Sequence, residues 1–172
     1  MKNFALGVLC GALLLFAVQV LYLRLGIAEV RGDLPPSALE TRFMAASVHA
    51  AVRRRAPEAP NPVPPSDENL IAGGKLYLAG CSGCHGTTRT PEDNGDSLFP
   101  PVPQLARIGT EYSEAQVFWV AKHGIRRTGM FANGKWNSDQ ELWTLAAFIK
   151  RIRELPPAVR QALEAKPSGA PN

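Results

Sequence analysis

Hydrophobic positions along the chain form one long apolar run and several shorter segments with helical spacing. The run covers residues 4–23, and Gln19 is its one strongly polar member. A helix of this length spans about 30 Å, the thickness of a bilayer core. The run therefore predicts a transmembrane anchor over residues 1–25. A cleaved signal peptide is the competing interpretation, although its apolar region usually has only about 7–15 residues.

Three segments further along place apolar residues three and four positions apart, which predicts helices. They cover residues 67–80, 113–123 and 138–153. The third begins with a capping box, in which Ser138 is followed three residues later by Glu141. No alternating strand pattern competes with them in the sequence. We therefore expect an all-α domain over residues 66–157, followed by a C-terminal tail over residues 158–172.

A further helix is predicted over residues 37–55, between the anchor and this domain. Ser37 is a good N-cap, Glu40 follows three residues later, and three arginines end the segment. Leu39 and Phe43 share one of its faces. The helix either lies on the membrane surface or packs as a stalk on its own domain or on a partner subunit. We favour the stalk.

Residues 56–65 contain five prolines. Such a stretch favours polyproline II and predicts a semi-rigid spacer of about 30 Å. Residues 26–65 are thus expected to be a stalk helix and a linker that lets the following domain swing on its anchor.

The formal net charge of +4 lies outside the central domain. Residues 67–155 contain ten basic and ten acidic side chains, so this segment is neutral. No long basic run with interleaved aromatic residues occurs in the sequence, and binding of nucleic acid has no support.

Candidate chemistry centres on Cys81, Cys84 and His85, which form a C-x-x-C-H motif. On one helical turn, two thiols can form thioethers with haem vinyl groups, and the adjacent imidazole can bind the iron. A structural zinc site requires four ligands, and the remaining cysteine, Cys10, lies in the apolar run. A thioredoxin-like pair belongs beside a βαβ pattern, which is lacking here. The motif therefore indicates one covalently bound haem c.

Met130 is the only methionine after this motif, and it lies in a predicted loop. A methionine thioether opposite His85 makes a six-coordinate iron and raises the reduction potential. A buried apolar side chain is the alternative for Met130, and His123 is the rival ligand. We expect His85 and Met130 to be the axial ligands.

These residues belong to a wider pattern, because residues 68–155 resemble the class I cytochrome c domain. Gly73 and Tyr77 stand eight and four residues before the first haem cysteine. In that family such residues let the first helix cross the last one closely, where Leu145 and Phe148 look like the partners. The resemblance implies the class I cytochrome c fold, with three main helices around one haem, behind the transmembrane helix.

The resemblance also implies roles for other residues. Pro103 looks like the family's proline whose carbonyl accepts a hydrogen bond from the ligand imidazole. The chain departs from the family at Phe131, where many relatives have proline, at residues 133–135, which look inserted, and in its long loop over residues 86–99.

Haem propionates need hydrogen-bond donors and positive charge. Trp119, Arg126, Arg127 and Trp136 are candidates for these contacts. Core packing or solvation is the default interpretation for all four.

Taken as a whole, the resemblance implies a membrane-tethered, mono-haem electron carrier between respiratory-chain components. Its partners would be a redox donor and a redox acceptor, with no catalytic residues and no small-molecule substrate. The first alternative is a haem-c subunit permanently docked in a larger oxidase, reductase or dehydrogenase complex. The second is a haem sensor or enzyme, which would require Met130 not to bind the iron. Because bacterial thioether attachment belongs outside the cytoplasm, we expect a single-pass protein of the bacterial inner membrane with a periplasmic haem domain.

Overall fold

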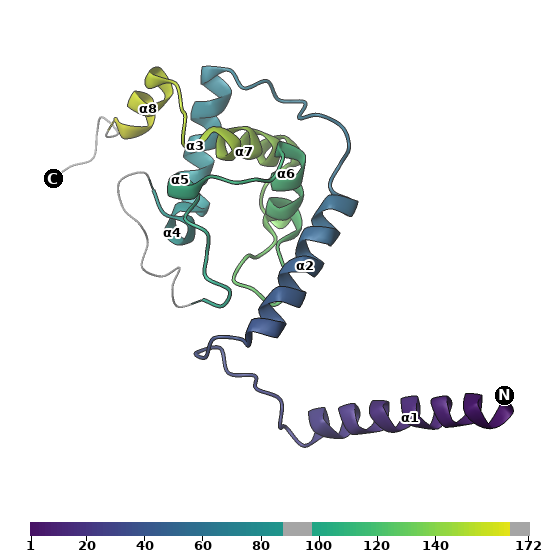
Figure 1. The fold of residues 1–172 in the computed structure, drawn as a ribbon. Coiled ribbons are helices and arrows are strands. Elements are labelled where there is room, and N and C mark those ends of the chain that lie inside the picture. Colours follow the sequence, from purple (N-terminus) through teal and green to yellow (C-terminus); the bar gives the residue numbers. More distant parts are fainter. Residues whose placement is uncertain (88–97, 166–172) are drawn as a thin grey trace. The chain divides into compact units, whose positions relative to one another are not determined.

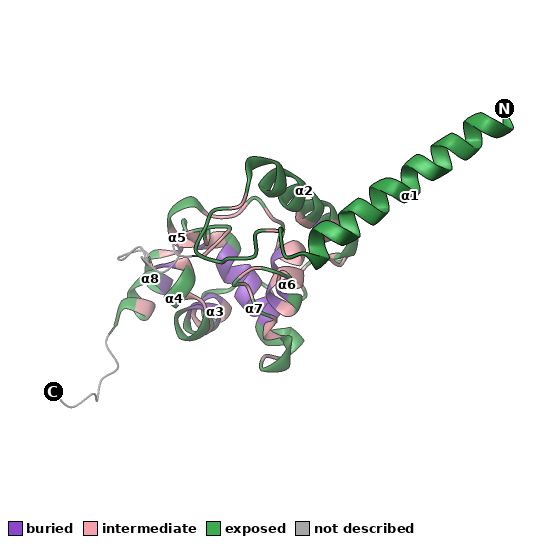
Figure 2. Ribbon diagram, turned by 90° about the horizontal axis from the view of Figure 1, so that it is seen from below, coloured by how far each residue is buried: buried purple, intermediate pink, exposed green. Residues whose placement is uncertain are grey.

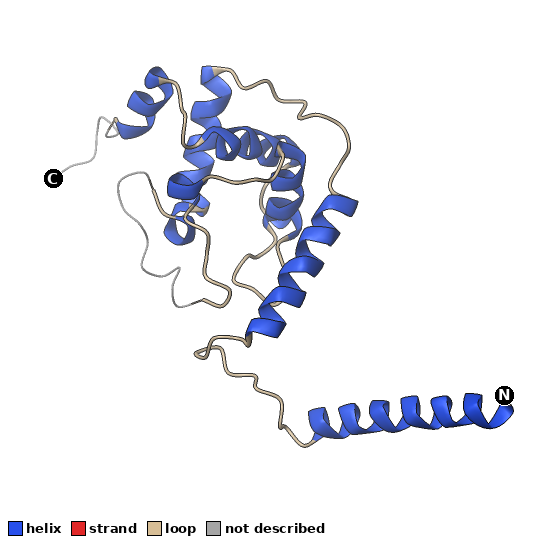
Figure 3. Ribbon diagram, in the orientation of Figure 1, coloured by secondary structure: helices blue, strands red, loops and turns tan. Residues whose placement is uncertain are grey.

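The computed structural model describes residues 1–87 and 98–165. Within these ranges the chain forms helices, turns and loops without a β-strand (Figures 1 and 3). It divides into two compact units, Met1–Gly32 and Asp33–Asn172. Most of the long loop expected over residues 86–99 lies outside the described residues. The all-α prediction is confirmed.

The first unit is dominated by helix α1, Lys2–Arg24, which is exposed along its whole length (Figure 2). Among the described residues it is the one helix long and apolar enough to cross a membrane. Length and composition alone support this, and a signal sequence passes the same test. The membrane anchor therefore stays a prediction.

Three main helices of the second unit lie close to their predicted bounds. They are α3 (Asp67–Gly80), α6 (Glu114–His123) and α7 (Asp139–Arg151). Each begins after a serine whose hydroxyl accepts a hydrogen bond from the backbone N–H three residues later. Such caps satisfy N–H groups that have no partner within the helix, which explains why the starts were readable from the sequence.

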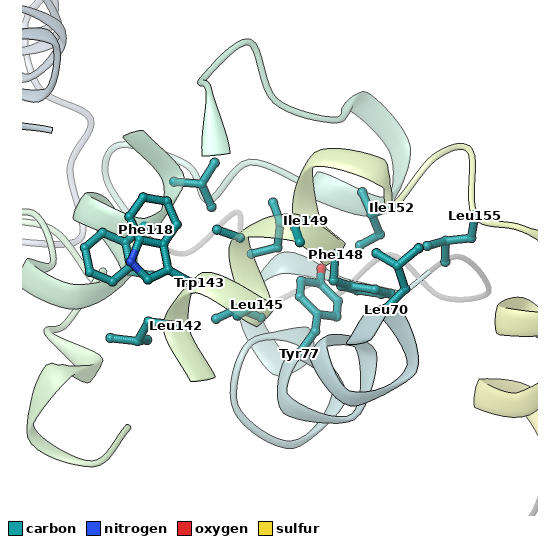
Figure 4. Close-up of a cluster of buried hydrophobic side chains, with 14 of the residues drawn as sticks. Leu70, Tyr77, Phe118, Leu142, Trp143, Leu145, Phe148, Ile149, Ile152 and Leu155 are labelled. Atoms are coloured by element: carbon teal, nitrogen blue, oxygen red, sulfur yellow. The ribbon is translucent and has the colours of Figure 1, made fainter. Parts of the chain in front are cut away.

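Helix α7 is the centre of the core, since it packs against both α3 and α6. All of residues 142–149 are buried. Figure 4 shows an aromatic pair on either side of it. Phe118 and Trp143 stack with their ring centroids 4.1 Å apart. Tyr77 and Phe148 meet with centroids 5.5 Å apart.

The crossing of α3 and α7 depends on Gly73. A Cβ atom at this position would lie 2.5 Å from the carbonyl oxygen of Thr144 and 2.8 Å from Cβ of Phe148. Only a residue without a side chain lets the two backbones come this close. The expected contact of Gly73 and Tyr77 with Phe148 is confirmed.

Shorter helices complete the unit. They are α4 (Ser82–His85), α5 (Leu105–Ile108), the 3-10 helix η2 (Asn133–Lys135) and α8 (Pro157–Glu164). Helix α8 packs on α3 and completely buries Val159. The predicted tail over residues 158–172 thus begins with residues of a helix, and Val159 on that helix belongs to the core.

Helix α2, Ala38–Arg55, packs on α6 in the same unit. Val52 is fully buried, and the ring nitrogen Nδ1 of His49 lies 2.8 Å from the Tyr112 hydroxyl. These contacts agree with a stalk helix that packs on its own domain. The face that carries Leu39 and Phe43 remains exposed.

The proline-rich segment over residues 56–65 is bound to the domain and does not act as a free spacer. The side-chain amide of Asn61 donates hydrogen bonds to Glu114 Oε2 at 2.6 Å and to the Trp143 carbonyl at 3.0 Å. Val63 packs against the core. The prolines make this segment stiff. Its position is set by the long-range contacts of Asn61 and Val63.

Candidate functional site

The C-x-x-C-H motif lies on a single helical turn directly after α3. The backbone N–H groups of Cys84 and His85 both donate to the carbonyl of Cys81, at 3.1 and 2.9 Å. This turn brings Cys81, Cys84 and His85 together, as the motif predicted. The turn follows directly from α3, so the crossing of α3 and α7 at Gly73 fixes the helix from which the motif extends.

One ring nitrogen of His85 forms a hydrogen bond. Its Nδ1 lies 2.9 Å from the carbonyl oxygen of Pro103. Because a carbonyl only accepts hydrogen bonds, Nδ1 carries the proton, and the lone pair of Nε2 is available for a metal. Burial lowers the pKa of His85, against the opposing effect of the Pro103 hydrogen bond. The neutral imidazole is therefore favoured, which is the form that binds iron.

The side chain of Tyr77 on α3 forms hydrogen bonds with the end of the motif turn. Its hydroxyl lies 3.1 Å from the carbonyl oxygen of His85 and 2.7 Å from that of Gly86. Burial raises the pKa of Tyr77, so the phenol stays protonated as a donor. Sequence reasoning placed Tyr77 at the helix crossing and missed these bonds, because residue spacing contains no signal for a side chain's hydrogen-bond partner.

Replacing Tyr77 by phenylalanine should lower the free energy of unfolding by about 1–3 kcal/mol, since two carbonyls in the core lose their donor. The ring would keep its contact with Phe148. Urea unfolding of the haem-loaded protein measures the change. Tyr112→Phe is the matched control, because its hydroxyl bonds an exposed partner and should contribute less. Equal midpoints for the two variants would contradict this role for Tyr77.

The two thiols of the motif differ in exposure. Cys81 is half-buried and Cys84 is exposed. Burial raises the pKa of the Cys81 thiol to about 11, and nearby Cys84 adds to the effect. A raised pKa keeps Cys81 in its thiol form at neutral pH.

Met130 lies in a loop whose backbone is held on both sides. Its N–H donates to the Thr128 hydroxyl at 3.0 Å, and its carbonyl accepts from the Ile125 N–H at 2.8 Å. Gly124 has a φ of +65°, and a Cβ there would lie 2.6 Å from the Met130 carbonyl oxygen. The loop therefore presents a half-buried methionine from a fixed backbone. Its binding to iron stays a prediction.

The candidate propionate contacts lie on α6, in the loop that follows it and directly after η2. Trp119 is half-buried on α6, with its ring centroid 5.1 Å from that of His123. Trp136 is 70% exposed and meets Phe131 edge-to-face. Arg126 and Arg127 are exposed and have no ion-pair partner in the part of the chain that the structure describes. The ring contacts of Trp119 and Trp136 are with His123 and Phe131 and not with the haem motif, so the roles of all four candidates stay predictions.

The residues of the motif fit a haem c better than a bare metal ion. Residues 1–87 and 98–165 contain no cluster of three or more His, Cys, Asp or Glu side chains that could hold a metal ion. Paired thiols and an oriented neutral imidazole on one turn instead match the donor set of haem c. A cavity of about 510 Å³ beside Tyr77 and α8 is a separate feature, because its lining includes neither cysteine of the motif nor His85 or Met130.

Comparisons with known proteins agree with this geometry. Residues 68–149 match the family model described as cytochrome c oxidase, cbb3-type, subunit III. No curated protein sequence matches the chain. A solved chain of the reducing HAO-like protein complex of Kuenenia stuttgartiensis is 24% identical, with a TM-score of 0.46. The match covers 59% of this chain and 53% of that one, so it spans about half of the solved chain, and nothing is inferred from it.

The matched segment contains nearly all of α3, the C-x-x-C-H turn, α6 and nearly all of α7. The family of this segment binds haem c covalently, in agreement with the thiols and imidazole described above. Residues 68–149 of this chain therefore form a c-type cytochrome domain.

Proposed function

We propose that the chain is a membrane-tethered carrier of single electrons, with haem c attached through Cys81 and Cys84 and its iron held by His85 and Met130. The observation that carries the proposal is the hydrogen bond between His85 Nδ1 and the Pro103 carbonyl, which orients the imidazole and leaves Nε2 free. Haem c supplies an iron that changes its oxidation state by one electron.

The protein's contribution is to keep the ligands in place in both oxidation states. Pro103 and Tyr77 hold the His85 turn from two sides. Thr128 and Ile125 hold the Met130 backbone. A site with both axial positions filled favours electron transfer over binding of a substrate.

Replacing Met130 by leucine tests this proposal. The oxidised holoprotein should lose the weak charge-transfer band of an iron–methionine bond and gain high-spin iron. The reduction potential should fall by something on the order of 100 mV, because axial ligands set this potential. Visible spectra and a redox titration measure both effects. Met44→Leu in α2 is the matched control, and an unchanged spectrum in Met130→Leu would exclude Met130 as the ligand.

A second candidate function is a haem subunit docked permanently in a larger complex. The matched family is described as an oxidase subunit, which favours this candidate. The bound linker also favours it, because the domain is not on a free spacer. Purification in mild detergent distinguishes the two functions, since a docked subunit should bring large subunits with it. In both cases we place the chain in the bacterial inner membrane, with the haem domain on the periplasmic side.

A further inference from the structure

Helix α2 has two apolar faces, and the domain covers only one of them. Val48 and Val52 lie on the side toward the domain, where Val52 is fully buried. The opposite side carries a stripe of apolar residues that fall within about 60° of one another on the helix. We call these residues the outward stripe: Leu39, Phe43, Ala46 and Ala50.

The outward stripe is open to solvent. Leu39 is 67% exposed and Phe43 is 69% exposed. Figure 2 shows most of α2 in the colour of exposed residues. A leucine and a phenylalanine one turn apart on an uncovered helix face are unfavourable in water unless something else covers them.

Positive charge borders the outward stripe on both sides. Helical spacing places Arg42 and Arg53 along one border and Arg54 along the other. All three are exposed. The ion pairs among the described residues involve none of them, and Arg53 lies near the hydroxyl of Tyr112. Helix α2 contains four arginines and one glutamate. An apolar stripe with basic borders is the pattern of a helix that lies in the headgroup region of an anionic membrane.

The chain itself brings α2 near a membrane, if α1 crosses one. Residues 25–37 join the two helices and can reach at most about 45 Å when fully extended. A protein partner would have to match three unpaired arginines around a narrow stripe with acidic groups, whereas lipid phosphates supply such groups everywhere on an anionic surface.

We propose that the outward stripe of α2 lies in the anionic headgroup region of the membrane that α1 crosses, with Arg42, Arg53 and Arg54 on lipid phosphates. This inference rests on the membrane anchor of the proposed function. Since Val52 and the His49–Tyr112 hydrogen bond hold α2 to the domain, the haem domain would be held at the membrane surface rather than swing freely.

Nitroxide labels on the full-length holoprotein test this. Cys10→Ser removes the free thiol, and a label is attached to Phe43→Cys in phosphatidylglycerol-containing nanodiscs with the haem reduced. The ratio of oxygen accessibility to that of a water-soluble nickel complex should be at least about threefold higher at position 43 than at Thr41→Cys. Thr41 is the matched control, because it is exposed on the same helix and points away from the stripe.

Charge is tested separately. Each of the variants Arg42→Gln, Arg53→Gln and Arg54→Gln should lower the ratio of membrane-bound to unbound α2 about fivefold. Nanodiscs of phosphatidylcholine alone should have a similar effect. The variant with all three arginines replaced by glutamine is tested as well. If the label at position 43 stays in lipid in this variant and in phosphatidylcholine nanodiscs, the role of the arginines is overturned.

A label on Leu14→Cys in α1 separates this inference from the anchor. If position 14 is in lipid while position 43 is fully accessible to the nickel complex, the inference is overturned and the anchor stands. If position 43 is immobilised and reached by neither reagent, a protein covers the stripe and the inference is also overturned. A position 14 in water would refute the anchor, and the inference would fail with it.

Discussion

Replacing both Cys81 and Cys84 by alanine should yield a chain with no haem attached after denaturation. Thioethers from these two sulfurs would be the only covalent links, so their loss leaves at most the bonds from iron, which denaturants break. The expected effect is complete loss of haem staining on a denaturing gel and loss of the mass of one haem in mass spectrometry.

Two controls sharpen this result. Cys10→Ala should retain full haem staining, since Cys10 lies in α1, outside the cytochrome domain. Each single variant, Cys81→Ala or Cys84→Ala, should keep its haem through one remaining thioether, at reduced yield. Haem that stays attached to the double variant after denaturation would show that the attachment site is elsewhere.

Replacing Gly73 by alanine should lower the free energy of unfolding by about 3 kcal/mol. The added Cβ would lie 2.5 Å from a backbone oxygen and 2.8 Å from the Cβ of Phe148. Neither atom is the end of a flexible side chain, so α3 and α7 must move apart. This cost exceeds the gain of about 0.5–1 kcal/mol that alanine normally brings over glycine in a helix. The midpoint of thermal unfolding should fall by about 6–12 °C.

Gly80→Ala is the matched control, because it makes the same change at the end of the same helix. No atom lies within 4 Å of a Cβ there, outside its own helix and chain neighbours. This variant should be as stable as the wild type or slightly more so. Similar losses in the two variants would show that the close approach of α3 and α7 is not the cause of the effect at Gly73.

The bounds of the main helices and the haem turn were readable from the sequence, because their causes are local. Ser66, Ser113 and Ser138 each bond the N–H three residues later, and this bond depends only on nearby residues. The C-x-x-C-H spacing likewise puts both thiols and the imidazole on one turn, whatever surrounds it. The link from His85 to Pro103 was expected only through the family resemblance, and the structure confirms the hydrogen bond.

Features that depend on distant contacts could not be read in this way. The Asn61 amide bonds Glu114 and Trp143, more than fifty positions away, and converts an expected spacer into a bound segment. Helix α8 packs on α3 although its residues lie far along the chain from that helix. Tyr77 looked like a packing residue, and its hydroxyl also holds the haem turn.

The sequence by itself determined the helical class, the helix starts and the chemistry of the haem turn, since capping bonds and ligand spacing act within a few residues. Only the tertiary structure decided which face of α2 is covered, where the proline-rich segment lies and how the Tyr77 hydroxyl holds the turn. The physical reason is that a side chain's neighbours are set by burial and hydrogen bonding across the fold, and residue spacing does not specify those partners.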